Sequence, residues 1–326
     1  MNRREFLSIT AGAAVTGAFA CVAHRQLVTP AAEPPVIDVP TFHASRRFVR
    51  TAFGRIAYVE RGQGPAALFM HGLPLNGYQW RGALDRLSPL RRCIAPDAMG
   101  LGYSEIPDSQ SLAPEDQADM VAALLDALGE SAVDLVASDS GGAVAQIFVA
   151  RHPGRVRTLL LTNCDAHDDS PPPALLPLIE ASRAGVFADE TLVPQLENKA
   201  SARLATGLGG CCFTYPMRFS DETIECYLRP LVGSESRKRQ LHAYNIGLAH
   251  NPLTAIESEL RRSPALLRVV WGTGDTLFDS ESPAWLDRTF PRSMGVRRIE
   301  GAKLFFPEEM PDVIADEARQ LWSAAS

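Results

Sequence analysis

The chain has 326 residues, of which 46% are hydrophobic and 21% charged, values that are ordinary for a folded globular protein. A formal net charge of −6 and no basic run in the sequence argue against a nucleic-acid partner or an anionic membrane surface. We therefore expect a small molecule as the partner. Composition leaves the oligomeric state open.

The first 40 residues are expected to precede the fold. Arg3 and Arg4 are followed by an apolar pair and by a mildly apolar stretch at 9–23, which contains a small-x-small cleavage site at 18–20. This pattern resembles a twin-arginine signal peptide, and a linker rich in Pro and Ala follows it at 27–40. The stretch is too short to predict a stable membrane span, and Cys21 lacks a lipoprotein signature around it. We expect export, to the periplasm, and the alternative is an uncleaved apolar N-terminus.

From residue 47 onward, strands and helices alternate. We expect strands at 47–51, 55–60, 66–70, 92–96, 133–137, 156–162, 266–271 and 295–299, and helices at 114–128, 142–152 and 307–322. This alternation predicts an α/β fold with a mostly parallel sheet and helices on both faces. The segment 169–259 shows helical patterns throughout and predicts an inserted helical cap, which divides the core into residues 41–168 and 260–326.

The most informative motif is the sharp turn between the strand at 133–137 and the helix that follows it. Centred on Asp139, small residues stand two positions before and two positions after, at Ala137 and Gly141, and Gly142 follows. Such a turn exposes one strained side chain above the sheet, usually a nucleophile. Asp139 is therefore the candidate nucleophile. Ser140 is a rival nucleophile, and Asp139 could alternatively only cap the helix.

Three further segments are expected near this turn, because open α/β sheets gather their sites at the carboxyl ends of strands. His71 to Pro74 follows one strand, and its Leu73 N–H could pair with the Ser140 N–H as an oxyanion hole. His71 itself is expected to hold this loop. Asp275 follows another strand, where a carboxylate can orient a histidine. The segment 163–168 follows the strand next to that of the turn.

Together these motifs resemble the α/β-hydrolase superfamily, in its branch of haloalkane dehalogenases and epoxide hydrolases. The resemblance implies an α/β-hydrolase fold with a cap. It also implies that Asp139 forms an alkyl-enzyme ester, that Asp275 orients a histidine, and that a base hydrolyses the ester. The family's histidine usually lies in a Gly-His pair before the last helix. In this chain Leu304 stands at that position, and no histidine follows His250.

Three hypotheses account for the missing histidine. His167, in the segment after the neighbouring strand, could act as a relocated base. Turnover could be lost, which leaves a binding protein or a single-turnover protein. A base could come from the cap, as His242 or His250, or the chemistry could need no histidine.

The residues that would bind the leaving group indicate the substrate class. A halide-binding tryptophan is usual after the nucleophile in the dehalogenases, but Ser140 stands there. Epoxide hydrolases use cap tyrosines, for which Tyr215, Tyr227 and Tyr244 are candidates. We expect a small apolar epoxide, haloalkane or ester, and the alternative is a serine esterase that uses Ser140. No metal-ligand cluster or phosphate-binding glycine loop is recognised in the sequence, so no cofactor or metal is expected.

Overall fold

The computed structural model describes residues 37–325. The predicted signal peptide, with Arg3, Arg4 and Cys21, lies outside these residues. Eight strands form one sheet in the order β1-β2-β4-β3-β5-β6-β7-β8. Their bounds are β1 Arg47–Thr51, β2 Gly54–Arg61, β3 Ala66–Met70, β4 Arg92–Pro96, β5 Val133–Asp139, β6 Val156–Cys164, β7 Leu266–Gly272 and β8 Ser293–Ile299.

The sheet has an antiparallel edge and a parallel centre. β1 and β2 form a hairpin, and β2 pairs with β4 in antiparallel fashion. All pairs from β4 through β3, β5, β6 and β7 to β8 are parallel. β3 and β5 are buried along their whole length, because helices cover both faces of a parallel sheet. The carboxyl ends of β3, β5, β6 and β7 therefore lie together at one edge.

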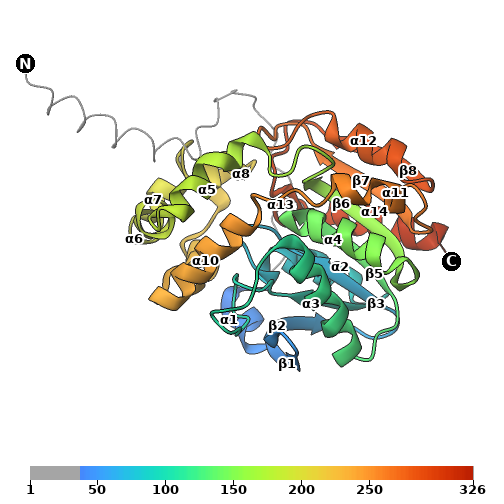
Figure 1. The fold of residues 1–326 in the computed structure, drawn as a ribbon, viewed down its shortest axis with the longest axis horizontal. Coiled ribbons are helices and arrows are strands. Elements are labelled where there is room, and N and C mark those ends of the chain that lie inside the picture. Colours follow the sequence, from blue (N-terminus) through green and yellow to red (C-terminus); the bar gives the residue numbers. More distant parts are fainter. Residues whose placement is uncertain (1–36, 326) are drawn as a thin grey trace, which may run out of the picture.

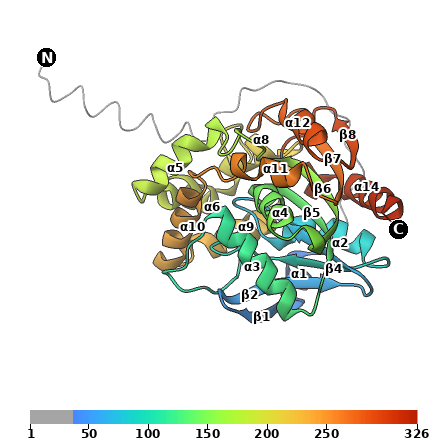
Figure 2. The ribbon, with the colours of Figure 1, turned by 45° about the vertical axis from the view of Figure 1, so that its right-hand side comes forward.

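Helices cover the two faces, as the alternation of the sequence predicts. α3 (Pro114–Ala127) and α4 (Ser140–Arg151) pack against each other, whereas α2 (Arg81–Leu87) and α14 (Pro311–Ala324) pack together elsewhere on the sheet (Figures 1 and 2). The remaining helices outside the cap are α1 Val39–Ala44, α11 Glu257–Leu260, α12 Ser282–Thr289 and α13 Phe306–Glu309. The fold is an α/β-hydrolase fold.

A group of helices between β6 and β7 gathers on one side of this core, at the left in Figure 1. They are α5 Leu176–Arg183, α6 Val193–Glu197, α7 Lys199–Ala202, α8 Leu208–Cys212, α9 Asp221–Val232 and α10 Glu235–Gly247. Short turns of 3-10 or π helix complete the structure: η1 Gly77–Trp80, η2 Pro153–Arg155, η3 Pro173–Leu175, η4 Ala188–Leu192, η5 Pro216–Arg218 and η6 Thr254–Ile256. We refer to the segment from η3 to α10 as the cap. None of the helices within residues 37–325 combines the length and apolar character that crossing a bilayer requires.

Several elements differ from the sequence prediction: α2 and α12 were not predicted, and α4 begins at Ser140, two residues before the expected helix. The helix expected at 307–322 is broken into α13 and α14 at Met310, which adopts φ −128° and ψ 56°. Pro311 explains the break, since proline disfavours helical geometry in the residue before it and has no N–H to donate. α1 begins at Val39, within the predicted linker, because Asp38 accepts the Thr41 N–H and Pro40 suits a first helical turn.

We predict that Gly142→Ala destabilises the protein by about 1–3 kcal/mol through overpacking. A Cβ at residue 142 would lie 2.3 Å from the Cβ of Cys164, where α4 crosses β6. Gly154→Ala is the matched control, because no heavy atom lies within 4 Å of its added Cβ. Urea denaturation of both variants measures the difference. Equal stability of the two would contradict this close packing of α4 on β6.

Candidate active site

The turn from β5 into α4 holds the strained residue of the site. Asp139 has φ 55° and ψ −139°, and α4 begins at the next residue, Ser140. A positive φ is uncommon for a residue with a side chain, and it is kept where the surroundings impose it. The surroundings are close here, since a Cβ on Gly72 would lie 2.2 Å from the Asp139 side chain. The strained position at the tip of the turn, where the sequence predicts a nucleophile, is thus occupied by Asp139 and not by Ser140.

Two backbone N–H groups point at this carboxyl. The N–H groups of Ser140 and Leu73 lie close enough to the Asp139 carboxyl to favour its ionised form and so to lower its pKa. The loop that carries Leu73 is held by the buried ring of His71, whose Nδ1 lies 2.9 Å from the Gly72 carbonyl oxygen and whose Nε2 lies 2.9 Å from the Ala98 nitrogen. These partners require Nδ1 to donate and Nε2 to accept. Burial lowers the pKa of His71, consistent with a neutral ring that positions the loop.

Asp275 follows β7 and is tied to the end of β6. Its Oδ2 accepts a 2.8 Å hydrogen bond from Asn163 Nδ2, and its Oδ1 accepts the Leu277 N–H at 3.0 Å. Asn163 also bonds both the N–H and the carbonyl oxygen of Gly272. Burial raises the pKa of Asp275 to about 6, although these donors favour its ionised form. Asn163 therefore fixes the end of β7 and Asp275 with it.

A narrow apolar cavity of about 30 Å³ opens onto Asp139. Space of this size holds little more than one or two water molecules. Its lining comes from the core and from the cap: Leu73, Pro74, Asp139, Ala174, Leu175, Leu178, Phe187, Leu208, Cys212, Leu277 and Leu304. Leu304, which stands where the sequence led us to look for a histidine, is only 2% exposed and shares this cavity with Asp139.

A larger hollow of about 730 Å³ lies elsewhere, between the β1–β2 hairpin, the loop after β4 and the end of α9 with the first turns of α10. It does not include Asp139 or the oxyanion loop. We place the candidate active site at the small cavity, because the strained carboxyl and its two N–H donors are there. Within residues 37–325, no group of three or more His, Cys, Asp or Glu side chains is arranged to hold a metal ion.

The electrostatics of the site are dominated by carboxyl groups. Burial raises the pKa of Asp139 well above its usual range, and the neighbouring charges of Asp165 and Asp275 raise it further, against the two N–H donors. Burial also raises the pKa of Asp165, one residue beyond β6, to about 7. The ends of β5, β6 and β7 thus each bring an acidic group, and the charges of Asp165 and Asp275 oppose the ionisation of Asp139.

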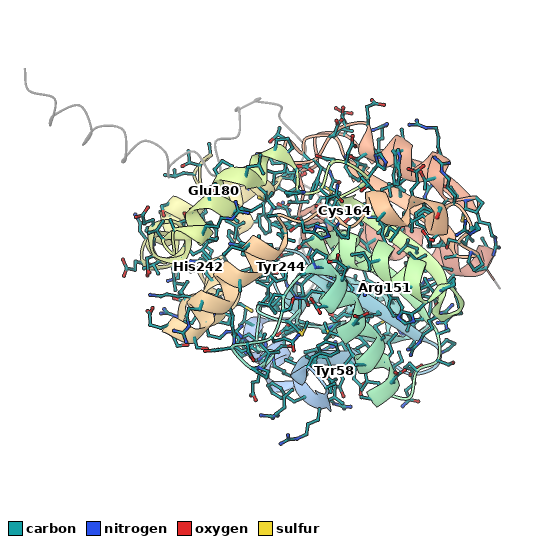
Figure 3. The ribbon with its side chains drawn as sticks, in the orientation of Figure 1. Tyr58, Arg151, Cys164, Glu180, His242 and Tyr244 are labelled. Carbon is teal, nitrogen blue, oxygen red and sulfur yellow. The ribbon has the colours of Figure 1, made fainter. Side chains whose placement is uncertain are left out.

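The cap reaches the turn through one tyrosine. The Tyr244 hydroxyl of α10 and Ser140 Oγ are 3.0 Å apart and both buried, and Figure 3 shows Tyr244 on the side of α10 that faces the core. Tyr227 donates a 2.7 Å hydrogen bond to Glu308. Tyr215 binds Glu309 through its backbone N–H, its ring packs with the Arg218 guanidinium, and it does not line the cavity. Of the three candidate tyrosines, the structure brings Tyr244 to the turn.

The geometry does not support His167 as a relocated base. Its Nδ1 lies 3.2 Å from Asp168 Oδ1, its Nε2 lies 3.2 Å from Glu257 Oε2, and its ring stacks on Trp285. With these partners about one third of the His167 side chain is exposed to solvent, and the residue does not line the cavity. Both ring nitrogens are thus directed at carboxylates other than Asp139, so we do not assign the base role to His167.

The cap histidines are also engaged away from the cavity lining. His242 Nε2 accepts the Ala188 N–H at 3.0 Å inside the cap. Figure 3 shows His242 on the side of α10 that faces the other cap helices, away from the core. His250 is mostly exposed, 3.3 Å from Glu115. Neither lines the cavity.

The segment around Leu304 is bonded directly to the cap. Phe305 N–H donates to the Cys212 carbonyl oxygen at 2.9 Å, and Lys303 N–H donates to Thr214 Oγ1 at 3.0 Å. Glu309 accepts the N–H groups of Thr214 and Tyr215 at 2.8 and 2.7 Å. Core and cap are therefore joined on both sides of Leu304, which fixes its side chain at the cavity.

Sequence reasoning missed two contributors to the site. Asn163 and Asp165 lie within the segment 163–168 that was expected near the turn, but neither received a role. The available signal was their position at the end of a strand beside that of Asp139. What makes them important is non-local: Asn163 bonds β7, and Asp165 is 4% exposed.

A family model for the α/β-hydrolase fold matches residues 65–309. The chain is 25% identical to haloalkane dehalogenase 2 of Mycobacterium tuberculosis over 297 residues, which is 85% of this chain and 95% of that protein. It is 28% identical to a soluble epoxide hydrolase of Corynebacterium sp. over 283 residues, 82% of this chain and 94% of that one. A haloalkane dehalogenase of Mesorhizobium japonicum is 43% identical over 102 residues, 31% of this chain and 33% of that protein.

Among solved structures, haloalkane dehalogenase DbeA from Bradyrhizobium elkanii is 26% identical with a TM-score of 0.68, covering 86% of this chain and 99% of that one. The epoxide hydrolase CorEH is similar in fold, with a TM-score of 0.68 at 22% identity and the same coverage. The chain belongs to the α/β-hydrolase family, in its branch of haloalkane dehalogenases and epoxide hydrolases. Its class is that of the hydrolases.

We predict that Asp139→Asn raises the melting temperature at pH 8, by about 2 °C or more for each kcal/mol gained. The pKa of Asp139 in the folded protein lies above its ordinary value of 3.8. The stability contributed by its proton is therefore present below pH 3.8 and is lost as the pH rises through the folded-state pKa. Asparagine carries no such proton, so the advantage of the variant shrinks toward pH 5.

Thermal denaturation followed by circular dichroism at pH 5 and pH 8 measures this difference. Asp168→Asn is the control, since its carboxylate is 87% exposed and its removal changes no buried charge. A melting temperature of Asp139→Asn below that of the wild type at pH 8 would contradict a destabilising carboxyl in the cavity.

Proposed function

We propose that the protein captures an electrophilic carbon as an ester of Asp139 and releases the product slowly. The observation that carries this proposal is the strained Asp139 with two N–H donors at the mouth of an apolar cavity. The carboxylate oxygen that faces the cavity would form the new C–O bond while the bond from that carbon to the halogen or to the epoxide oxygen breaks. A halide then leaves as an anion, whereas the epoxide oxygen stays on the bound product and takes a proton from water. The other oxygen would become the ester carbonyl and keep the Leu73 and Ser140 N–H groups as its donors.

Hydrolysis of that ester needs water at the carbonyl carbon and a group that takes its proton. In the relatives' branch this group is usually a histidine before the last helix. Leu304 stands there, buried in the cavity beside Asp139. A leucine cannot accept a proton, and it also occupies space that the attacking water would need. We therefore propose a capture step that is faster than the release step.

The cavity supports a small apolar substrate. Apart from Asp139, the lining consists of aliphatic and aromatic side chains, Pro74 and Cys212. An epoxide, a haloalkane or an ester with a short apolar chain matches this lining in polarity, and the cavity of about 30 Å³ would have to widen to admit one. Ser140 is the weaker nucleophile, because its hydroxyl is paired with Tyr244 and its backbone is helical.

We predict that incubation with a reactive epoxide adds the mass of one epoxide to the wild type, that a haloalkane adds its mass less that of the hydrogen halide, and that Leu304→His removes this adduct by turnover. A histidine at residue 304 would line the same cavity as Asp139, and a general base accelerates such steps by about 10²–10⁴-fold. Intact-protein mass spectrometry over time gives the rates of capture and release. Leu304→Gln is the matched control, because glutamine is polar but not basic.

Asp139→Asn should form no adduct, and His167→Ala should behave as the wild type does. If the wild type shows full turnover with no adduct, the slow-release proposal is wrong. If neither the wild type nor Leu304→His reacts with any member of the panel, a binding protein is favoured instead.

We also propose export by the twin-arginine route, on the basis of residues 1–40 alone. Fusing these residues to a folded reporter tests this proposal. Export that is lost when Arg3 and Arg4 are both replaced by Lys supports it, and a reporter that stays in the cytoplasm with the original residues contradicts it.

A further inference from the structure

Three acidic residues lie at the carboxyl ends of three neighbouring strands, and one of them, Asp139, lines the cavity. Asp139 ends β5, Asp165 follows β6 and Asp275 follows β7, and these strands are adjacent in the sheet. Asp139 and Asp165 are each only 4% exposed. The described residues that line the cavity include no Lys, Arg or His. A nucleophile in this place therefore shares its surroundings with like charges.

The groups that act electrostatically in this cluster come from every element around it. They are Asp165 and Cys164 at the end of β6, Asp169 in the segment that follows, Asp275 after β7, Cys212 of α8, Tyr244 of α10 and Lys303 before α13. Burial raises the pKa of both cysteines and of Tyr244, so these three stay neutral at ordinary pH. The Lys303 ammonium donates to the Gly210 carbonyl oxygen at 2.6 Å in the cap.

Asp165 is the strongest of the charged neighbours of Asp139. After burial itself, its charge is the largest cause that raises the pKa of Asp139, ahead of Asp275. The backbone of Asp165 is held in place, because its carbonyl oxygen accepts a 2.7 Å hydrogen bond from Gln146 of α4, and the nearby Ser170 hydroxyl lowers the pKa of its carboxyl. Two buried carboxyls that interact in this way lose their protons in separate steps.

We propose that Asp165 is a positioning residue that acts through Asp139. Its buried carboxyl lies at the end of the neighbouring strand and favours the protonated form of the nucleophile. Asp165 thereby sets the pH above which the protein captures its substrate. This inference rests on the proposed function. The ionised carboxyl of Asp139 is the form that makes the ester bond, because the protonated acid is a much weaker nucleophile. Capture is then slow in acid and accelerates as the second carboxyl of the pair ionises.

The test measures the capture rate from pH 5 to pH 9 for the wild type, Asp165→Asn and Asp168→Asn, with an epoxide and intact-protein mass as the readout. Asparagine at 165 keeps an oxygen for the Ser170 hydroxyl but carries no charge. We expect the midpoint of the Asp165→Asn profile to move to lower pH with an unchanged plateau. If the midpoint falls by about one on the pH scale, capture at acidic pH rises on the order of tenfold. Asp168→Asn removes an exposed charge of the same loop and should leave the midpoint unchanged, since solvent and salt screen it.

A second readout does not need a reaction. The infrared C=O band of a protonated carboxylic acid that disappears in Asp139→Asn reports the protonation of this residue directly, and its titration should shift to lower pH in Asp165→Asn. An unshifted midpoint in both readouts, or a lowered plateau without a shift, would overturn the role of Asp165. A shifted infrared titration without capture of any electrophile would support the coupling and contradict the proposed function, so the two failures are distinguishable.

Discussion

The strained turn at Asp139 is the constraint on which the rest of the site depends. A positive φ at a residue with a side chain is unfavourable. Here it is maintained because the chain passes from β5 into α4 at this single residue. The close approach of Gly72 to the Asp139 side chain and of Gly142 to Cys164 shows how tightly the turn is enclosed. The turn delivers the carboxyl to the two N–H groups, and it places the same carboxyl beside the ends of β6 and β7.

The second determinant of function is the contact between cap and core around Leu304. Hydrogen bonds from Phe305 and Lys303 to the cap, and from the cap to Glu309, hold the segment on both sides of this residue. A side chain that is fixed in this way cannot give way to water or to a base from solvent. The arrangement for capture is therefore retained, while the position from which release is normally catalysed is filled by an apolar group. The leucine at residue 304 also explains why no basic side chain lines the described cavity, because a histidine there would have placed a basic group beside Asp139.

Much of the fold was predictable from local pattern. All eight strands were predicted to within three residues at each end. The central strands β3 and β5 were recognisable as continuous apolar runs because they are buried on both faces, and β1 and β2 were recognisable by the turn residues between them. The turn at Asp139 was recognisable because only small residues fit around it. Pro311 indicates a helix break at Met310, but the apolar periodicity of residues 307–322 favours one continuous helix, and the sequence prediction followed the periodicity.

The directions of polar side chains were less predictable. His167 stood in a segment that correctly pointed to the site, yet its ring turns to Glu257 and Trp285, which are about 90 and 120 positions further along the chain. Asn163 and Asp165 gain their importance from β7 and Asp139 in the same non-local way. Sequence position can therefore indicate which loop takes part, but not which of its side chains faces the cavity.

The most direct test of the account is a crystal structure of the wild-type protein after exposure to a small epoxide. The account predicts continuous density from an Asp139 carboxyl oxygen to the substrate carbon. The ester carbonyl oxygen should lie within hydrogen-bond distance of the Leu73 and Ser140 N–H groups, and Leu304 should pack against the bound chain. Density for a substrate bonded to Ser140, or an unmodified Asp139 after complete conversion of the epoxide in solution, would contradict it.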